Sequence, residues 1–423
     1  MCFRGMNLIL LLAVGLVPDA AALFSHSTFL VHAEEPKLLR MAGITTLYRR
    51  HSHADVLLSR LLETDTLDGQ GRKLPWKLVS VYADQVAADD LSQPYARKYG
   101  FRLSPTIQDA LTLGTQELAV DGVFLIAEHG TYPMSPTGQI EYPKRRLFSE
   151  MVEVFQKSRR VVPVFHDKHF ADTTQDALWY YETAKTQKIP LMAGSSIPST
   201  WRDPPIDVPR GAVLSHVLVL SYGPLDAYGF HGLELLQALA ERRRGGETGV
   251  KSVKTISGPA VWEALDTGTI PASLVQAALA RFKKRPPLGL AVARNKVVQP
   301  VAFQVQYRDG TVGTVLTLPG VAAEWSAAWS VRGVAEIESF TVDLQDEHPY
   351  MHFGQLLHGL EPFFESGQPT WPVERTLTTT LLLDAALTSH SLDGKVVMTN
   401  ALSDGYPSDW SWRQPTEHGR LRK

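Results

Sequence analysis

The chain has almost no cysteine. Among its 423 residues only Cys2 is a cysteine, and it lies in the extreme N-terminal segment. A single thiol in that place excludes an intramolecular disulfide, a cysteine-ligated zinc ribbon and thiol catalysis. The redox compartment of the protein therefore cannot be inferred from its cysteines.

An excess of basic charge is also missing. The 42 lysine and arginine residues face 44 aspartate and glutamate residues, which leaves a formal net charge of -2. No basic tail or stripe interrupts this balance, so a nucleic-acid partner has no electrostatic support. The length is too great for one ordinary core and predicts two or three domains.

Long hydrophobic runs occur only at the N-terminus. Arg4 precedes the apolar run of residues 8–17, which is too short to span a bilayer but is typical of a signal peptide. Small residues suited to cleavage follow at 20–22 and 31–33. We therefore expect residues 1–33 to be a signal peptide and the mature protein to be exported, periplasmic or extracellular, without a membrane span. If synthesis starts further along the chain, the protein would be cytoplasmic.

Strand and helix patterns alternate over the first half of the chain. Continuous apolar strands separated by amphipathic helices predict an α/β fold with a doubly wound, Rossmann-like parallel sheet and helices on both faces. Such sheets bind ligands beyond the carboxyl ends of their strands. The expected strands are 38–47, 77–83, 122–127, 161–165 and 189–193, and the expected helices are 54–63, 92–99, 106–113, 144–157 and 174–187.

The second half predicts a different domain. The segment 201–205 (WRDPP) is non-helical and marks a boundary, so we expect a Rossmann-like domain over 34–205. Beyond it we expect an α+β domain over 206–400 with an open, largely antiparallel sheet, and an irregular tail over 401–423. The expected strands are 213–221, 250–256, 301–307, 311–318, 322–330 and 336–342, and the expected helices are 231–243, 353–365 and 373–389.

Four short stretches follow the order of a known enzyme family. Residues 120–127 and 189–194 are strand-like, 160–173 contains an acid-lysine pair, and 226–234 reads DAYGFHGLE. Together they resemble the Gfo/Idh/MocA oxidoreductases, the glucose-fructose oxidoreductase and inositol dehydrogenase family. The acid-lysine pair matches the family's Glu-Lys-Pro motif, and DAYGFHGLE matches its Gly-x-His motif.

The resemblance implies an oxidoreductase that binds NAD or NADP and transfers a hydride to or from a sugar or polyol. Lys168 would orient or protonate the substrate oxygen, with Asp167 as the acid beside it. His231 would accept the hydroxyl proton, and Asp226 would fix the tautomer of a neighbouring imidazole. The open sheet would pair face to face in a homo-oligomer, as in the family.

The glycine fingerprint of a dinucleotide site is missing. The first strand runs into Leu-Tyr-Arg-Arg-His-Ser-His over residues 47–53, where such a site has Gly-x-Gly-x-x-Gly. Arg49, Arg50 and the helix-capping Ser52 could hold an anion such as the cofactor pyrophosphate, or could form a capped helix start with solvated arginines. The other residues expected at the cofactor are Gly43, His53, Asp84 (at the ribose), Glu128 and His129.

Histidines recur at the predicted strand ends. Because these ends converge on one crevice in a doubly wound sheet, they indicate a site between the domains. We expect substrate contacts from His166, His169, Tyr142, Ser195 and Trp201.

Two other functions remain open from the sequence. A divalent metal held by His51, His53, Glu128 and His129 could support a lyase or hydrolase, although no metal signature such as His-Glu-x-x-His is present. A lyase or hydrolase could also work by acid-base chemistry alone. Alternatively, the chain could be an exported carbohydrate-binding protein without catalysis.

Overall fold

The computed structural model describes residues 38–415, apart from 68, 285–288, 348–349 and 403. The expected signal peptide, residues 1–33, and the end of the expected tail, 416–423, lie outside the described residues. Within the described ranges, no helix combines the length and the apolar character that a membrane span needs.

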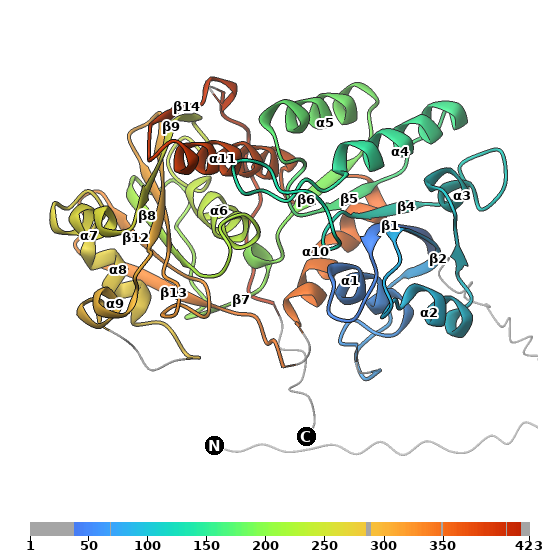
Figure 1. Ribbon diagram of the computed structural model, residues 1–423, viewed down its shortest axis with the longest axis horizontal. Helices are drawn as coiled ribbons and strands as arrows, with labels where there is room; N and C mark the ends of the chain where they lie inside the picture. The colour runs from blue at the N-terminus through green and yellow to red at the C-terminus, as the bar shows by residue number, and fades with distance from the viewer. Residues whose placement is uncertain (1–37, 68, 285–288, 348–349, 403, 416–423) are drawn as a thin grey trace, which may run out of the picture. The chain divides into compact units, whose positions relative to one another are not determined.

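The first sheet consists of six parallel strands in the order β3-β2-β1-β4-β5-β6 (Figure 1). This order is that of the Rossmann fold, in which the chain reverses direction between β1 and β4. The five strands predicted from the sequence are all present, and β3 is an addition. The strands are β1 (Leu39–Leu47), β2 (Trp76–Gln85), β3 (Arg102–Leu103), β4 (Gly122–Ile126), β5 (Val164–Asp167) and β6 (Leu191–Gly194).

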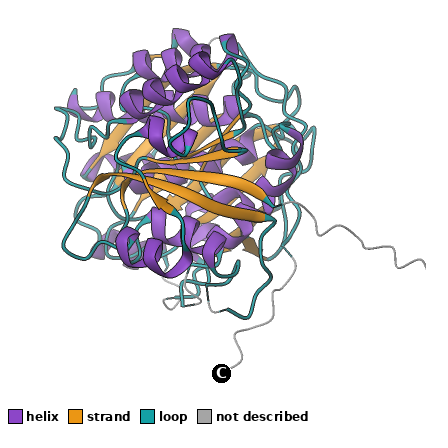
Figure 2. Cartoon of the chain, turned by 90° about the vertical axis from the view of Figure 1, so that its right-hand side faces the viewer, coloured by secondary structure: helices purple, strands orange, loops and turns teal. Residues whose placement is uncertain are grey.

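The helices of this half begin at signals that are visible in the sequence. Ser52, Thr106 and Thr173 each accept a hydrogen bond from the backbone N–H of an aspartate three residues later. Such caps satisfy N–H groups that the first helical turn leaves unpaired. Figure 2 shows helices on both sides of the strands. The helices are α1 (His53–Leu62), α2 (Ser92–Tyr99), α3 (Ile107–Thr112), α4 (Lys144–Ser158) and α5 (Thr174–Thr186).

One helix of the first half comes from late in the chain. Helix α10 (His352–Ser366) packs on the first sheet together with α1, and its Phe364 ring lies 5.4 Å from Trp76 and 5.0 Å from Phe124. Conversely, β7 (Trp201–Asp203) pairs with the second sheet. Elements therefore cross the boundary expected near residue 205 in both directions.

The second sheet has eight strands in the order β14-β9-β10-β11-β8-β12-β13-β7. Only β11 and β8 pair in parallel, so the expectation of an open, largely antiparallel sheet is confirmed. Its further strands are β8 (Leu214–Ser221), β9 (Val250–Ser257), β10 (Val301–Tyr307), β11 (Val312–Thr317), β12 (Ser326–Val331), β13 (Ile337–Asp343) and β14 (Val397–Met398). Two short 3-10 helices are η1 (Ile197–Ser199) and η2 (Asn400–Leu402).

Both faces of the second sheet carry helices. Alternate residues of β8 face opposite sides: Val217 and Val219 pack with α6 (Ala227–Ala240) and α11 (Val373–Ser391), whereas Leu218 and Leu220 pack with other helices. These are α7 (Pro259–Asp266), α8 (Ala272–Leu279) and α9 (Leu290–Lys296), which the sequence analysis missed.

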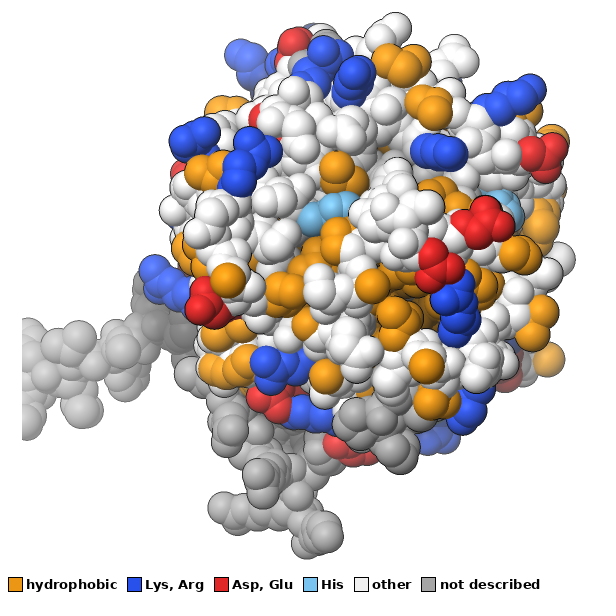
Figure 3. All heavy atoms as spheres, turned by 90° about the vertical axis from the view of Figure 1, so that its left-hand side faces the viewer, with side chains coloured by type: hydrophobic (Ala, Val, Ile, Leu, Met, Phe, Trp, Pro, Cys, Tyr) orange, Lys and Arg blue, Asp and Glu red, His pale blue; other side chains and the backbone are white. Residues whose placement is uncertain are grey.

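Helices α7, α8 and α9 cover the face of the second sheet that could have paired with a second copy of the chain. An open sheet face was expected to pair with a second copy, but here helices of the same chain cover it. On the side of the molecule that bears α7 and α9, charged side chains of both signs surround hydrophobic ones (Figure 3). The homo-oligomer stays a prediction.

The packing of α10 on the first sheet is testable. Replacing the buried Phe364 with alanine removes a ring that contacts two aromatic neighbours, so we expect Phe364→Ala to lower the free energy of unfolding by about 3–5 kcal/mol. Urea unfolding measures the change. Leu392→Ala, at a side chain that is 44% exposed, is the control and should have little effect. Equal effects of the two substitutions would contradict this packing.

Candidate active site

A cavity of about 360 Å³ lies where the first sheet meets elements of the second. Its polar wall follows the carboxyl ends of β1, β4 and β5, where parallel strands bring sequence-distant side chains together. Of the residues predicted from the sequence, the cavity is lined by His51, His53, Glu128, His129, Tyr142, Lys168 and His231.

Backbone strain is concentrated at this cavity. Four lining residues other than glycine have left-handed backbone conformations: His51 (φ 63°), His129 (φ 67°), Lys168 (φ 68°) and Tyr350 (φ 56°). Each such residue costs about 1–3 kcal/mol, and such strain gathers at functional sites. The strain is independent support for a functional site here.

Lys168, which follows β5, has a buried ionic partner. Its Nζ lies 3.0 Å from Oε1 of Glu128, and both side chains are almost fully buried. Burial alone would lower the pKa of Lys168, but the charges of Glu128 and Asp167 raise it above its ordinary value. Burial would likewise raise the pKa of Glu128, but Lys168 and then His53 hold it well below its ordinary value. Lys168 is thus an ammonium group at neutral pH.

The first residue of α1, His53, is paired with the other acid of this region. Its Nδ1 lies 2.6 Å from Oδ2 of Asp167, whose side chain is only 2% exposed. The imidazole packs against the rings of His129 and Phe353 at 5.4 Å and 4.9 Å. Asp167 therefore lies behind the cavity wall and orients His53, a contact that the sequence did not reveal.

A second oriented imidazole comes from α6. Nδ1 of His231 lies 2.6 Å from Oγ of Ser195, and the Ser195 N–H donates to Oε2 of Glu234. Burial, followed by the charges of Lys168 and His53, holds the pKa of His231 well below its ordinary value. His231 is therefore a neutral imidazole at neutral pH. Ser195, expected to contact substrate, instead holds this ring.

Aromatic rings form the opposite wall of the cavity. Tyr228 and Trp325 are stacked with centroids 5.4 Å apart, Tyr222 packs on Trp325 at 4.6 Å, and His231 lies 5.4 Å from Trp325. His352 and Phe353 of α10 complete the lining. Tyr222, Tyr228, Trp325 and Phe353 were not among the expected site residues, because no local pattern in the sequence indicates that they share a cavity.

Several predicted residues do not line the cavity. Nδ1 of His166 lies 2.8 Å from the Tyr180 hydroxyl, and Nε2 of His169 lies 2.6 Å from Nζ of Lys144, so both histidines belong to the buried interior beside α4 and α5. Trp201 is buried in the edge strand β7.

Asp226, at the start of α6, also lies outside the cavity lining. Its Oδ2 accepts the Ile140 N–H at 3.1 Å. It therefore does not fix an imidazole tautomer by a hydrogen bond, the role that the resemblance implied for it.

The turn between β1 and α1 does not fit a dinucleotide diphosphate. A dinucleotide site leaves the N–H groups of this turn and of the helix start open for the diphosphate. Here Oδ2 of Asp55 accepts the His51 N–H at 2.9 Å, and Oγ of Ser52 accepts the N–H groups of Arg49 and Asp55. The Asp55 carboxylate, only 7% exposed, thus stands where an anion would bind and would repel it.

The other residues expected at the cofactor are also engaged elsewhere. Gly43 lies within β1 beneath Leu58. Asp84 accepts hydrogen bonds from Tyr82, Tyr132 and Arg146, and these lower its pKa although burial alone would raise it. Arg49 and Arg50 are exposed, and Arg49 lines a separate cavity of about 340 Å³ near the end of β2.

No metal centre is formed by the part of the chain that the structure describes. Within those residues, no group of three or more histidine, cysteine, aspartate and glutamate side chains could hold a metal ion. The expected metal set of His51, His53, Glu128 and His129 shares a cavity but is not such a group.

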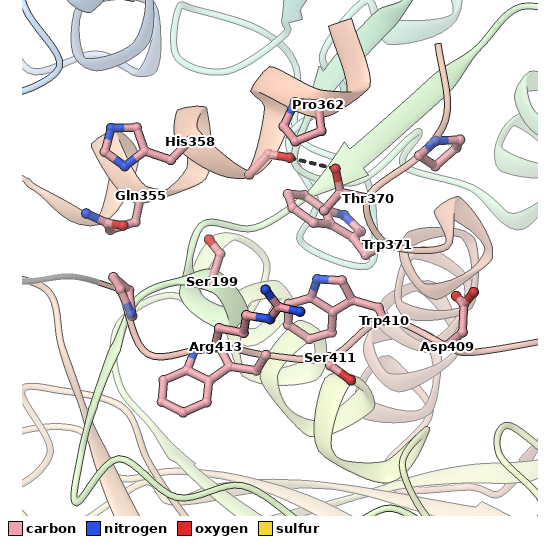
Figure 4. Close-up of a pocket in the computed structure, with 14 residues that line it drawn as sticks. Ser199, Gln355, His358, Pro362, Thr370, Trp371, Asp409, Trp410, Ser411 and Arg413 are labelled. Carbon is pink, nitrogen blue, oxygen red and sulfur yellow. Dashed lines mark hydrogen bonds between the residues drawn. The ribbon is translucent and has the colours of Figure 1, made fainter. Parts of the chain in front are cut away.

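A larger cavity of about 670 Å³ lies along α10 (Figure 4). It is lined by Gln355, His358 and Pro362 of that helix and by three tryptophans, Trp371, Trp410 and Trp412. None of the residues predicted for catalysis or binding lines it. The smaller cavity is therefore the candidate active site.

Comparisons with known proteins identify the fold. No protein-family model matches the chain, and no curated protein matches it in sequence. Solved structures do match over nearly the whole chain, and two of them contain a nicotinamide cofactor. GenD2 from gentamicin A biosynthesis, in complex with NAD, is 14% identical with a TM-score of 0.52, covering 91% of this chain and 100% of that one. An oxidoreductase from Agrobacterium radiobacter, in complex with NAD+, L-tartaric acid and magnesium, is 13% identical with a TM-score of 0.52, covering 86% and 99%.

An apo scyllo-inositol dehydrogenase from Lactobacillus casei is also similar. It is 11% identical with a TM-score of 0.53, covering 86% of this chain and 98% of that one. At these identities the likeness shows the fold alone. The chain thus has the fold of Gfo/Idh/MocA-type dehydrogenases, as the resemblance in sequence implied.

The buried pair of Glu128 and Lys168 predicts a pH-dependent effect. Glu128→Gln leaves a buried ammonium without its nearest partner and should cost about 3 kcal/mol of unfolding free energy at neutral pH. The pKa of Glu128 is lowered in the fold, so the pair stabilises the folded protein fully at pH values above 4.5, the ordinary pKa of a glutamate. This stabilisation is lost as the pH falls through the lowered pKa of Glu128.

The measurement is urea unfolding of wild type and variant at a series of pH values. The difference in unfolding free energy should be full at neutral pH and should shrink in acid below pH 4.5. Glu336→Gln, at an exposed glutamate, is the control. A difference that does not change with pH would rule out an ionised Glu128 as its origin.

Proposed function

We propose that this chain is an enzyme that acts on a sugar or polyol in the 360 Å³ cavity, with Lys168 and His231 in contact with the substrate. One observation carries the proposal: an ammonium group, two oriented imidazoles and a wall of aromatic rings share this cavity. Its volume lies within the roughly 300–1,000 Å³ typical of small-molecule sites.

The cavity suits a polyhydroxylated substrate. Trp325 and Tyr228 offer flat apolar surfaces on which the C–H faces of a sugar ring can stack. Lys168 and His231 offer hydrogen bonds to hydroxyl or carbonyl oxygens. Because Lys168 stays protonated and His231 stays neutral, the pair can stabilise negative charge that develops on a substrate oxygen.

A nicotinamide-dependent dehydrogenase is the second candidate, and the fold favours it. Two of the similar structures are complexes with NAD or NAD+, and others are inositol dehydrogenases. In such an enzyme the nicotinamide would receive or donate a hydride beside Lys168 and His231. The occupied turn between β1 and α1 disagrees with this candidate, so no hydride step is assigned to the residues of this chain.

We also propose that the protein is exported, because the apolar run of residues 8–17 is typical of a signal peptide. Cell fractionation followed by mass spectrometry of the mature N-terminus tests this proposal. A cytoplasmic protein that keeps residues 1–33 would contradict it.

If this cavity is the active site, substitutions of two lysines with similar backbone conformations should differ in their effect on turnover. Lys168 and Lys188 both have positive φ, but Lys188 is exposed and outside the cavity. Lys168→Ala and His231→Ala should each reduce turnover by about 10²–10⁴-fold, whereas Lys188→Ala should not change it.

Turnover is measured by NMR on a panel of sugars, sugar acids and inositols, with and without NAD or NADP. Circular dichroism and thermal unfolding confirm that each variant is folded. If folded Lys168→Ala and His231→Ala variants both keep wild-type turnover, this cavity is not the active site.

A further inference from the structure

We propose that the cavity catalyses a proton transfer at carbon without an external oxidant, with His53 as the base and a sugar or sugar acid that carries a carbonyl group as the substrate. This inference rests on the proposed function, because it assumes that the cavity binds a carbohydrate-like molecule. It goes further by assigning the reaction class and a base other than Lys168 and His231.

His53 is the first residue of the helix that follows β1. In a dinucleotide-binding fold, the start of the helix after β1 faces the diphosphate with open N–H groups. In this chain the same helix start presents an imidazole that is wedged between His129 and Phe353. The N–H of His51, in the preceding turn, donates a hydrogen bond to the Asp55 carboxylate. Protein acid-base groups thus occupy the position that would otherwise serve the cofactor.

The tautomer of His53 follows from its contact with Asp167. A carboxylate only accepts hydrogen bonds, so the 2.6 Å contact with Asp167 assigns the proton to Nδ1 and leaves a lone pair on Nε2. In the described part of the chain, Nε2 has no hydrogen-bond partner. The ring lines the cavity. An imidazole held by a carboxylate at Nδ1 with Nε2 free is the arrangement of a general base.

His231 has the complementary tautomer. Oγ of Ser195 accepts a hydrogen bond from the Ile197 N–H at 3.0 Å. The Ser195 hydroxyl can donate its own proton in one further hydrogen bond. Nδ1 of His231, at 2.6 Å, is the acceptor within reach among the described residues, so the proton of His231 is assigned to Nε2. Beside Lys168, this N–H supplies a second donor for a substrate oxygen.

These roles define a balanced reaction. Nε2 of His53 takes a proton from the carbon next to the substrate carbonyl, and the electron pair of that C–H bond forms a carbon-carbon double bond. The carbonyl π electrons move onto oxygen, where Lys168 and the N–H of His231 stabilise the charge. The former carbonyl oxygen gains a proton from Lys168, and the imidazolium of His53 returns its own proton to the carbon that bears this oxygen. The hydroxyl on the adjacent carbon gives its proton back to Lys168 as it becomes the new carbonyl, which gives an isomer. No electrons leave or enter the substrate.

The first test asks whether a nicotinamide cofactor binds. The full chain is titrated with NAD, NADH, NADP and NADPH at concentrations up to millimolar, by calorimetry and by thermal shift. We expect no saturable binding and no shift. Saturable binding together with cofactor reduction in the presence of a sugar or polyol would overturn this inference and leave the proposed site intact.

The second test detects the proton transfer itself. D-fructose, D-xylulose and D-glucuronate, the last in its open-chain aldehyde form, are incubated with the protein in D₂O, and ¹H NMR follows deuterium entry next to the carbonyl. We expect exchange that His53→Gln reduces by about 10²–10⁴-fold, while the matched control His390→Gln leaves it unchanged. Absence of exchange with all three probes would overturn the assignment.

The third test separates the role of Asp167 from a purely structural one. The Asp167 carboxylate holds the proton of His53 on Nδ1, so Asp167→Asn should change the populations of the two His53 tautomers in ¹⁵N NMR and reduce the exchange rate of a variant that circular dichroism shows to be folded. Tautomer populations of His53 that are identical in Asp167→Asn and wild type would contradict the pair. If Lys168→Ala and His231→Ala also leave exchange unchanged, the proposed function itself fails.

Discussion

The charges of two buried carboxylates, Glu128 and Asp167, determine how this site is built. Glu128 follows β4 and Asp167 is the last residue of β5, the neighbouring parallel strand, so the fold brings them together at one edge of the sheet. An unpaired buried carboxylate costs several kcal/mol, and each one here has its own cationic or hydrogen-bonding partner. Lys168 pairs with Glu128, and His53 pairs with Asp167. The charge state of Lys168 and the orientation of His53 depend on this arrangement. Burial keeps His231 neutral, and the charge of Lys168 adds to this effect by lowering the pKa of His231 further.

The cavity is completed by parts of the chain that lie far from these strands. His231 comes from α6, Trp325 from the loop before β12, and His352 and Phe353 from α10, which packs on the first sheet although it follows the second in sequence. A fold of this kind does not by itself decide the reaction. The similar solved structures include complexes with NAD, yet in this chain the turn after β1 is closed by its own Asp55 and Ser52. This chain therefore has the fold of those structures but not the open turn that holds a cofactor diphosphate.

Much of the fold could be read from local patterns. The strands of the first sheet are apolar because both faces are covered, and the caps at Ser52, Thr106 and Thr173 mark helix starts. Helices α7, α8 and α9 were missed because they are short and lack such side-chain caps. Among the residues singled out in the sequence, Lys168, His231, Glu128 and His53 line one cavity in the structure, and each follows a predicted strand or matches a motif. His166 and His169 were misplaced in the cavity, since neither the twist of the strand end nor the partners Tyr180 and Lys144 can be read from their neighbours in sequence.

The sequence by itself determined the class of fold, the absence of a glycine-rich turn and the presence of acid-base residues after successive strands. These properties depend on residue type and spacing along the chain, which periodicity and turn chemistry make visible. Only the tertiary structure decided which carboxylate holds which partner, which nitrogen of each imidazole is left for a substrate, and that Asp55 closes the turn. The physical reason is that these properties depend on distances of a few ångströms between residues that are far apart in sequence, such as the 2.6 Å between His53 and Asp167.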